Sequence, residues 1–539
     1  MSTDKPPTAT GPDAAPTSST GRGLLQSISI VSAMTLLSRV SGLVRDIVLA
    51  RYFGASLVMD AFIVANRIPN MLRRFFGEGA FSQGFVPVMA RYRENHTEEE
   101  ARQFVDAMSG TLGLLLFIIT LIGVILAPLL VAIVAPGFVG DDGRFDMATL
   151  MLRFTFPYLF FISLIAFSAG VLNTYGKFAA AAFTPVWLNL ALISAAIWLA
   201  PYLDEPGMAL AYGVFVAGIV QLLFQIPFLA KIRFVPRPKF NLRHTGVRRA
   251  SRLMLPAIFG SSIAQVNVLI GGMIASLLGV GKISLLYYSD RLMEFPLGLF
   301  SIALATVILP YLSRQHANNS AKQFSDAVDW SMSLVCLIVI PAAVGLIVMA
   351  GPLVATIFYG GVFTAYDVRM TALALQAFSI GLVGFSFIKI LVPAYFARED
   401  ARTPVKIGVI AVAVNFTLSV GFALWLTKIE YAGTHAGLAL AVSIAAIVNA
   451  LLLYRGLRRE DVLPKKPACL RLLPRIVVAC GVMALVVIEI QRPLGWWLEA
   501  SVVTRASWLG LCISISVLCY FLVLFILGIR PSHFQLNRS

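Results

Sequence analysis

The stretch LLLFIITLIGVILAPLLVAIV, residues 114–134, decides the fold class of this chain. It contains no charged side chain, and about 20 apolar residues in a helix cross the hydrocarbon core of a bilayer. Backbone polar groups find no water inside a bilayer, so they must bond to one another within the segment. The stretch therefore predicts a membrane-spanning helix.

The composition extends this prediction to the whole chain. Of its 539 residues, 58% are hydrophobic and 13% are charged, whereas soluble domains average about 45–50% apolar and about 25% charged residues. A membrane β-barrel is not expected, because its strands alternate apolar and polar residues and raise the mean hydropathy little. The sequence predicts an all-α polytopic membrane protein.

Apolar runs divide the chain into about fourteen transmembrane helices. The predicted spans are 25–50, 58–90, 107–136, 147–173, 181–202, 207–230, 252–279, 283–312, 328–358, 369–396, 404–427, 432–454, 470–491 and 505–528. Charged residues make the second span weak by hydropathy, and the sequence DRLMEF interrupts the eighth.

The connecting loops predict how these spans are oriented. Residues 231–252 contain eight Lys and Arg and no acid, and residues 454–471 are also rich in Lys and Arg, whereas 137–146 are acidic. Basic loops stay in the cytoplasm, so both termini are expected there. The net charge of +16 is then explained by anionic membrane lipids, and no nucleic-acid partner is expected.

An internal repeat predicts two lobes. Pro87 of FVPVMARY matches Pro310 of ILPYLSRQ, and the triplet TPV at 184–186 matches the triplet at 403–405, at nearly one offset. The offset holds six spans, so the two copies run in the same direction, as in transporters built from parallel repeats. The predicted organisation is a disordered cytoplasmic tail (1–24), an N-lobe (25–232), a basic linker (233–251), a C-lobe (252–456), two C-terminal helices (457–528) and a second tail (529–539).

Charged residues cluster inside three of the predicted spans. An ionised side chain in the middle of a membrane costs at least about 2.5–3.5 kcal/mol, so it is expected to face a polar cavity. These residues are Arg39, Arg45 and Asp46 in the first span, Asp60, Arg67, Arg73, Arg74 and Glu78 in the second, and Asp290, Arg291 and Glu294 in the eighth. Helical spacing places Asp60, Arg67, Arg74 and Glu78 on one stripe, although Pro69 can turn Arg73 inward instead.

An excess of arginine in a cavity between two lobes predicts an anionic ligand. Guanidinium groups stay charged and form bidentate hydrogen bonds with phosphate oxygens, so a diphosphate suits this cluster. The alternative is that the charges only form internal ion pairs: Arg39 with Asp46, Arg67 with Asp60, and Arg291 with Glu294. The sequence carries no catalytic motif or metal-ligand spacing, so a transporter without a cofactor is expected, driven by a coupling ion or by the membrane potential.

Several long motifs resemble the MurJ/MviN family, the lipid II flippases of bacterial peptidoglycan synthesis. They are SRVSGLVRDIVLARYFGA (38–55), the stretch from DAFIVANRIPNMLRRFF to MARY (60–92), YYSDRLMEFPLGLFSIALATVILPYLS (287–313) and REDARTPVKI (398–407). The resemblance covers nearly the whole chain after residue 24. It implies the fold of the multidrug/oligosaccharidyl-lipid/polysaccharide exporter superfamily, with two six-helix lobes and two C-terminal helices.

The resemblance also implies roles for single residues. The family's diphosphate-binding arginines correspond to Arg39, Arg45, Arg73 and Arg291, and Ser38, Asp46, Asp60, Arg74, Asp290 and Glu294 are expected to support the cavity. The two C-terminal helices would form a groove for the polyprenyl tail. Some relatives bind sodium through an acid on the eleventh span, where this chain has Asn415 and no acid, so the resemblance does not extend to this sodium-binding acid.

The function that the resemblance implies is translocation of lipid II, an undecaprenyl-diphosphate-linked disaccharide-pentapeptide, from the cytoplasmic to the periplasmic leaflet of a bacterial inner membrane. Proteins of cell-wall synthesis and division are its expected partners. Two alternatives stay open: a multidrug or polysaccharide-precursor exporter of the same superfamily, and a membrane scaffold whose arginines bind anionic lipid head groups. A cation-drug exporter should have a cavity richer in acids than in arginine.

Overall fold

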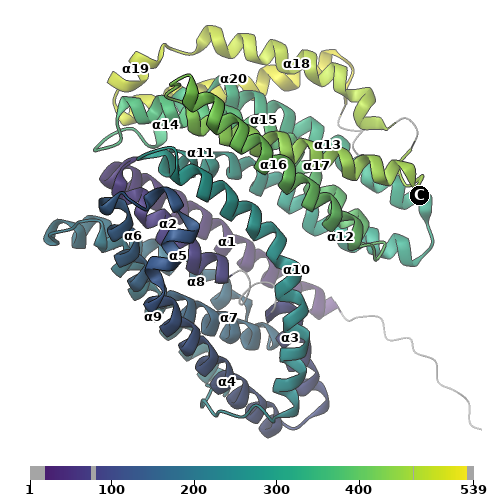
Figure 1. Cartoon of the computed structure of the whole chain (residues 1–539). Coiled ribbons are helices and arrows are strands. Elements are labelled where there is room, and N and C mark those ends of the chain that lie inside the picture. Colours follow the sequence, from purple (N-terminus) through teal and green to yellow (C-terminus); the bar gives the residue numbers. More distant parts are fainter. Residues whose placement is uncertain (1–17, 74–80, 465–466, 531–539) are drawn as a thin grey trace, which may run out of the picture.

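The computed structural model describes residues 18–73, 81–464 and 467–530 (Figure 1). These residues are almost entirely helical and contain no strand, only an isolated bridge between Gly360 and Phe363. The predicted all-α class is confirmed. The first helix begins at Ser18, so residues 18–24 of the predicted disordered tail are helical, because hydropathy marks the membrane-spanning part of a helix and not where its hydrogen bonding starts. The remaining tail residues, 1–17 and 531–539, lie outside the described ranges.

The first lobe contains the first nine α-helices of the chain. They are α1 (Ser18–Phe53), α2 (Leu57–Arg73), α3 (Phe81–Asn95), α4 (Glu98–Ile125), α5 (Ala127–Val134), α6 (Asp142–Thr155), α7 (Tyr158–Thr174), α8 (Phe178–Ser194) and α9 (Met208–Lys231), with the short turns η2 (Pro136–Phe138), η3 (Ala195–Leu199) and η4 (Ala200–Tyr202). Several predicted spans are thus built from two consecutive helices.

The second lobe and the C-terminal helices follow after the basic linker. They are α10 (Thr245–Ser276), α11 (Lys282–Pro296), η5 (Leu297–Ser301), α12 (Ile302–Ala317), α13 (Ala321–Val348), α14 (Ala350–Ile357), α15 (Ala365–Phe396), α16 (Arg402–Lys428), α17 (Thr434–Arg459), α18 (Ala468–Ile490), α19 (Leu494–Glu499) and α20 (Val502–Ile526). Figure 1 shows the two groups of helices on either side of α1, α10 and α11, with α18–α20 on the outer side of the second group.

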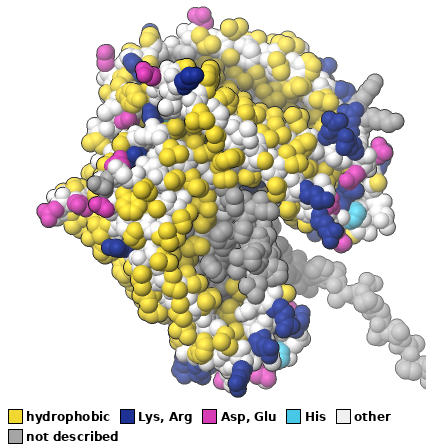
Figure 2. Space-filling model, in the orientation of Figure 1, with side chains coloured by type: hydrophobic (Ala, Val, Ile, Leu, Met, Phe, Trp, Pro, Cys, Tyr) yellow, Lys and Arg dark blue, Asp and Glu magenta, His cyan; other side chains and the backbone are white. Residues whose placement is uncertain are grey.

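Eleven helices among the described residues are long and apolar enough to cross a membrane. They coincide with eleven of the fourteen predicted spans. The predicted ranges 25–50, 58–90 and 252–279 contain helices α1, α2 with α3, and α10, which are not among these eleven; α2 and α3 are each shorter than 18 residues. The count of fourteen therefore stays a prediction. Hydrophobic side chains cover most of the middle of the face in Figure 2, and charged side chains gather toward its edges.

The predicted interruption of the eighth span has a structural counterpart. The sequence DRLMEF lies inside α11, which ends at Pro296 and continues as the π-helical turn η5 and then α12. Proline cannot donate the backbone hydrogen bond that a regular helix needs at that position, and π-helical turns are common at functional sites. The polar residues of α11 therefore sit on a continuous span that changes its helical geometry after Pro296.

The two lobes meet at the ends of the helices opposite the basic linker, which we call the far face. The backbone N–H of Gly281 donates to Oδ2 of Asp60 at 2.6 Å, and the N–H of Gly137 donates to Oγ of Ser276 at 3.0 Å. The N–H of Val362 donates to the carbonyl oxygen of Arg51 at 3.0 Å. At the other end, which we call the linker face, α10 of the second lobe packs against α3 of the first. The contacts at the far face close that end of the space between the lobes.

Candidate binding cavity between the lobes

Arg45 lies at the centre of a polar network that joins the lobes. On α1, its Nε and Nη2 donate to Oδ1 of Asp46 at 2.9 and 2.7 Å. Its Nη1 donates to Oδ1 of Asn189 on α8 at 3.0 Å, and its Nη2 reaches the hydroxyl of Tyr287 on α11 at 3.2 Å. Each nitrogen of this guanidinium thus has an acceptor, so the position of Arg45 is fixed before any ligand arrives.

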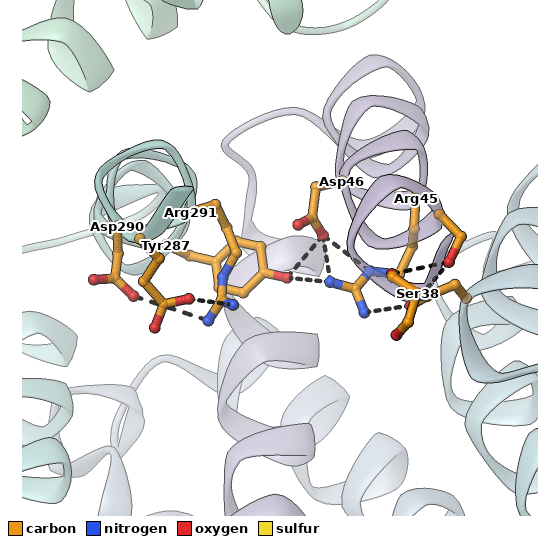
Figure 3. Close-up of polar contacts among 9 residues, drawn as sticks. Ser38, Arg45, Asp46, Tyr287, Asp290 and Arg291 are labelled. Carbon is orange, nitrogen blue, oxygen red and sulfur yellow. Dashed lines mark hydrogen bonds and ion pairs between the residues drawn. The ribbon is translucent and has the colours of Figure 1, made fainter. Parts of the chain in front are cut away.

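Tyr287 connects Arg45 to the second arginine of the cavity. Its hydroxyl donates to Oδ1 of Asp46 at 2.9 Å, and the guanidinium of Arg291 lies over its ring, 5.1 Å from the centroid. Figure 3 shows Tyr287 between Arg45 and Arg291. Arg291 itself donates to Oε2 of Glu294 at 2.8 Å, and its side chain remains 35% exposed, so it can still reach a ligand.

A cavity of about 510 Å³ opens beside this network. We call it the arginine chamber. The polar and charged residues that line it are Arg45, Asn66, Asn70, Arg73, Tyr158, Thr184, Gln221, Gln225, Tyr287 and Arg291. Among the described lining residues there are three arginines and no carboxylate, so this chamber is suited to an anion.

A second cavity of about 370 Å³ adjoins the first and shares Asn66, Asn70, Tyr287 and Arg291 with it. We call it the mixed chamber. It lies between α2, α10, α11, α15 and α17, and its further polar lining residues are Arg67, Gln265, Asp290 and Glu294. Acids and bases balance there among the described residues, so its character differs from that of the arginine chamber.

Arg39 and Ser38 lie at the edge of this arrangement. Arg39 is exposed and does not line either chamber. Its Nη1 is 2.0 Å from the point where a Cβ of residue 298 would stand, so its guanidinium packs directly on Gly298 of η5. The carbonyl oxygen of Ser38 accepts a hydrogen bond from Nδ2 of Asn189 at 3.2 Å. Ser38 therefore supports Arg45 indirectly, by orienting Asn189.

Asp60 acts at the far face and not in the cavity. It is completely buried, and its Oδ1 accepts hydrogen bonds from both the N–H and the hydroxyl of Ser284, at 2.8 and 2.6 Å. Together with the bond from Gly281, these contacts satisfy the free N–H groups at the start of α11, where a negative charge is favourable. An aspartate of one lobe thus caps a helix of the other.

The three ion pairs considered from the sequence have different outcomes. Arg291 does pair with Glu294. The pair of Arg39 with Asp46 is wrong, because Asp46 pairs with its neighbour Arg45. The pair of Arg67 with Asp60 is also wrong, since Asp60 turns toward α11. Helical spacing alone does not show that an acid can instead bond to backbone N–H groups of another helix.

Of Arg73 and Arg74, the two candidates for an inward-facing arginine on this part of the chain, only Arg73 lies among the described residues. Arg73 lines the arginine chamber and donates from Nε to Oδ1 of Asn70 at 2.9 Å. Arg74 and Glu78 lie outside the described residues. The helical stripe did not predict an inward Arg73, whereas the family resemblance did.

Sequence reasoning missed the uncharged polar residues of the site. Asn189 holds Arg45, Gln221 accepts from the hydroxyl of Tyr158 at 3.1 Å, and Gln225 donates to Oγ1 of Thr184 at 3.1 Å. Each of these amides lies within an otherwise apolar run. An amide inside a predicted span is costly to bury without a partner, and this signal could have identified them.

An apolar cavity of about 340 Å³ lies in the second lobe, apart from both chambers. Its walls come from α13, α15, α17 and the beginning of α18, including Cys336, Phe387, Tyr454 and Cys469. The predicted groove for a polyprenyl tail was placed between both C-terminal helices. Of these two helices, α18 lines this cavity and α20 does not.

The arrangement of the helices is that of a known class of membrane transporter. A multidrug resistance MATE family transporter of the MOP superfamily, solved in an inward-facing conformation, aligns with a TM-score of 0.61 at 15% identity, over 80% of this chain and 98% of that chain. A solved structure of lipid II flippase MurJ in an inward closed conformation aligns with a TM-score of 0.76 at 25% identity, over 92% of this chain and 98% of that chain.

Sequence comparison then gives the particular family. The pattern of the family described as "Lipid II flippase MurJ" matches residues 49–505. The chain is 44% identical to the probable lipid II flippase MurJ of Haemophilus influenzae, over 93% of this chain and 99% of that protein. It is 40% identical to the lipid II flippase MurJ of Burkholderia cenocepacia, over 95% and 99%. This protein belongs to the MurJ family.

Proposed function

We propose that this protein moves lipid II from the cytoplasmic to the periplasmic leaflet of the bacterial inner membrane by alternating access. The observation that carries the proposal is the arginine chamber, in which α1, α2 and α11 each contribute one arginine to a single cavity. Arg45 and Arg73 come from the first lobe and Arg291 from the second. A diphosphate bound by all three is held by both lobes at once.

Arg45 and Arg291 differ in how firmly the surrounding residues hold them, and this difference suits successive steps of ligand binding. Arg45 is fixed by Asp46, Asn189 and Tyr287, so it provides a positive charge in a constant place. Arg291 is partly exposed, and its Nε has no hydrogen-bond partner among the described residues. Arg291 can therefore bind phosphate oxygens without first giving up every bond that it makes. A guanidinium and a phosphate form strong, bidentate hydrogen bonds in such a site.

In the state described here the far face is closed, and we propose that this is the state that receives the substrate. Asp60 and the other contacts at the far face hold the lobes together there. Substrate then enters from the linker side, and its tail stays in lipid or in the apolar cavity beside α18. Release requires the far-face contacts to break, and a ligand shifts this equilibrium only if it binds one state better than the other.

The orientation of the chain follows from its basic loops. The linker face carries the Lys- and Arg-rich connection between α9 and α10, so we place this face and both termini in the cytoplasm. The membrane potential can bias the cycle, because moving one charge through 100 mV changes the free energy by about 2.3 kcal/mol. We expect proteins of cell-wall synthesis to be the partners of a protein with this function.

The exporter and scaffold alternatives are not favoured. A cavity for cationic drugs needs acids, whereas the described lining of the arginine chamber has none. The relatives that match over nearly their full length are named as lipid II flippases. A scaffold needs no pair of adjoining polar cavities at the boundary of two lobes.

Transport by the purified protein tests the proposal. In proteoliposomes with lipid II in one leaflet, the wild-type protein should move lipid II to the other leaflet, and Arg73→Ala or Arg291→Ala should reduce the rate at least tenfold. Arg248→Ala, which changes an exposed arginine on the linker face, is the matched control and should keep the wild-type rate. Wild-type rates in both cavity variants would contradict the site.

A further inference from the structure

The two chambers differ in charge, so each of them suits a different chemical part of one ligand. The arginine chamber has three arginines and no described carboxylate in its lining, whereas the mixed chamber has Arg67 and Arg291 against Asp290 and Glu294, with the amide of Gln265. A diphosphate needs the first environment. A peptide with both anionic and neutral polar groups is suited to the second.

Arg67 interacts electrostatically with Asp290 of its own chamber, but one of its nitrogens is left without an acceptor among the described residues. It lies on α2, and its Nη1 is buried with no hydrogen-bond partner among the described residues. Asp290 is shared with Arg291, whose Nη2 lies 3.8 Å from Oδ2 of Asp290. A buried guanidinium nitrogen without an acceptor is unfavourable, because it has lost its hydrogen bonds to water. An external acceptor would remove this cost.

Gly272 on α10 makes the position of Arg67 possible. Nη1 of Arg67 lies 1.7 Å, and Cζ 2.9 Å, from the point where a Cβ of residue 272 would stand. Any side chain at this position would therefore displace the guanidinium. A methyl group on the neighbouring Gly271 would meet no atom within 4 Å. Of these two adjacent glycines, only Gly272 is required for the position of Arg67.

We propose that the mixed chamber receives the sugar–peptide part of the lipid II head group, and that Arg67 binds a carboxylate of its peptide. This inference rests on the proposed function, because it assumes that the diphosphate occupies the arginine chamber next to it. Arg67 is then a second anion-recognising residue of the site, directed at the peptide and not at the phosphates. Guanidinium and carboxylate match in planar, bidentate geometry.

Binding of three probes to the full-length protein tests this assignment. The probes are lipid II, lipid II with its peptide carboxylates amidated, and undecaprenyl diphosphate, which lacks sugar and peptide. Arg67→Gln should weaken binding of lipid II about tenfold, as expected for the loss of one charge-assisted hydrogen bond. It should change the binding of the amidated lipid and of undecaprenyl diphosphate less than twofold. Arg67→Lys, which keeps the charge, should recover part of the loss.

Two glycine-to-alanine variants separate the loss of this contact from a general effect of an added methyl group. Gly272→Ala should weaken lipid II binding as Arg67→Gln does, and should add nothing in the Arg67→Gln background, because both changes remove the same contact. Gly345→Ala, which lies outside both chambers and where a methyl group meets no atom within 4 Å, should bind all three probes like the wild-type protein. Equal weakening of undecaprenyl diphosphate by Arg67→Gln, or unchanged binding of lipid II, would overturn the assignment. If the wild-type protein binds none of the three probes, the proposed function itself fails.

Discussion

The hydroxyl of Tyr287 on α11 donates a 2.9 Å hydrogen bond to Oδ1 of Asp46 on α1, across the boundary between the two lobes. The same carboxylate oxygen accepts two hydrogen bonds from Arg45, and the Tyr287 ring lies beneath Arg291. One tyrosine thus links arginines of both lobes. Ligand binding to either arginine can in this way affect the contact between the lobes.

Tyr287→Phe removes this link and keeps the ring. We expect the state described here to lose about 1.5–3 kcal/mol of stabilisation, the usual contribution of a hydrogen bond to a charged group. Spectroscopic distances between spin labels on the two lobes at the linker face should then broaden or shift in the absence of substrate. An unchanged distance distribution would show that the hydroxyl does not hold the lobes together.

Asp60→Ala should open the far face. The change leaves buried N–H donors at the start of α11 without an acceptor, and each such donor costs about 1–3 kcal/mol. A cysteine introduced near the far end of the cavity should react faster with a membrane-impermeant thiol reagent added to the far side. Asp60→Asn, which retains one carbonyl acceptor, should give an intermediate rate. Equal rates in all three proteins would contradict a sealing role.

Gly298→Ala should mimic the loss of Arg39. The guanidinium of Arg39 occupies the space that a side chain at position 298 would need, so the alanine forces the arginine away from η5. We expect transport to fall in Gly298→Ala to the level of Arg39→Ala, with no further fall in the double variant. Gly345→Ala is the control, since a methyl group there meets nothing within 4 Å. Normal transport by Gly298→Ala would show that this contact is dispensable.

Asp329 should govern the attachment of α18 to the second lobe. Its two carboxylate oxygens accept the backbone N–H of Ala468 at 3.0 and 2.9 Å, which caps the first turn of α18 from outside. The loss of such a cap costs about 1 kcal/mol. We expect Asp329→Ala to loosen this end of α18.

The native cysteines provide the measurement for Asp329→Ala. Cys336 on α13 and Cys469 on α18 are neighbours in the wall of the apolar cavity, so a mild oxidant should join them in the wild-type protein. The yield should fall in Asp329→Ala, and should be absent when Cys469 is replaced by Ser. An equal yield in the wild-type protein and Asp329→Ala would rule out the proposed anchoring.

The sequence by itself determined the all-helical membrane class, because long uncharged runs leave few other structures open to a chain in a bilayer. It also predicted that Arg39, Arg45, Arg73 and Arg291 share one cavity, partly through the cost of burying charge and partly through family resemblance, and the last three of these line the arginine chamber. These inferences depend on residue type and on the spacing of residues within each predicted span.

Only the tertiary structure decided which groups meet. Asp60 caps α11 more than 200 residues away, Asn189 and Tyr287 fix Arg45 from two other helices, and Arg39 and Arg67 pack on Gly298 and Gly272. No periodicity along a single helix contains this information, because these partners come from separate helices. Their distances and directions are set by how the lobes pack, and a glycine gives no sign in the sequence that a guanidinium of another helix fills the space beside it.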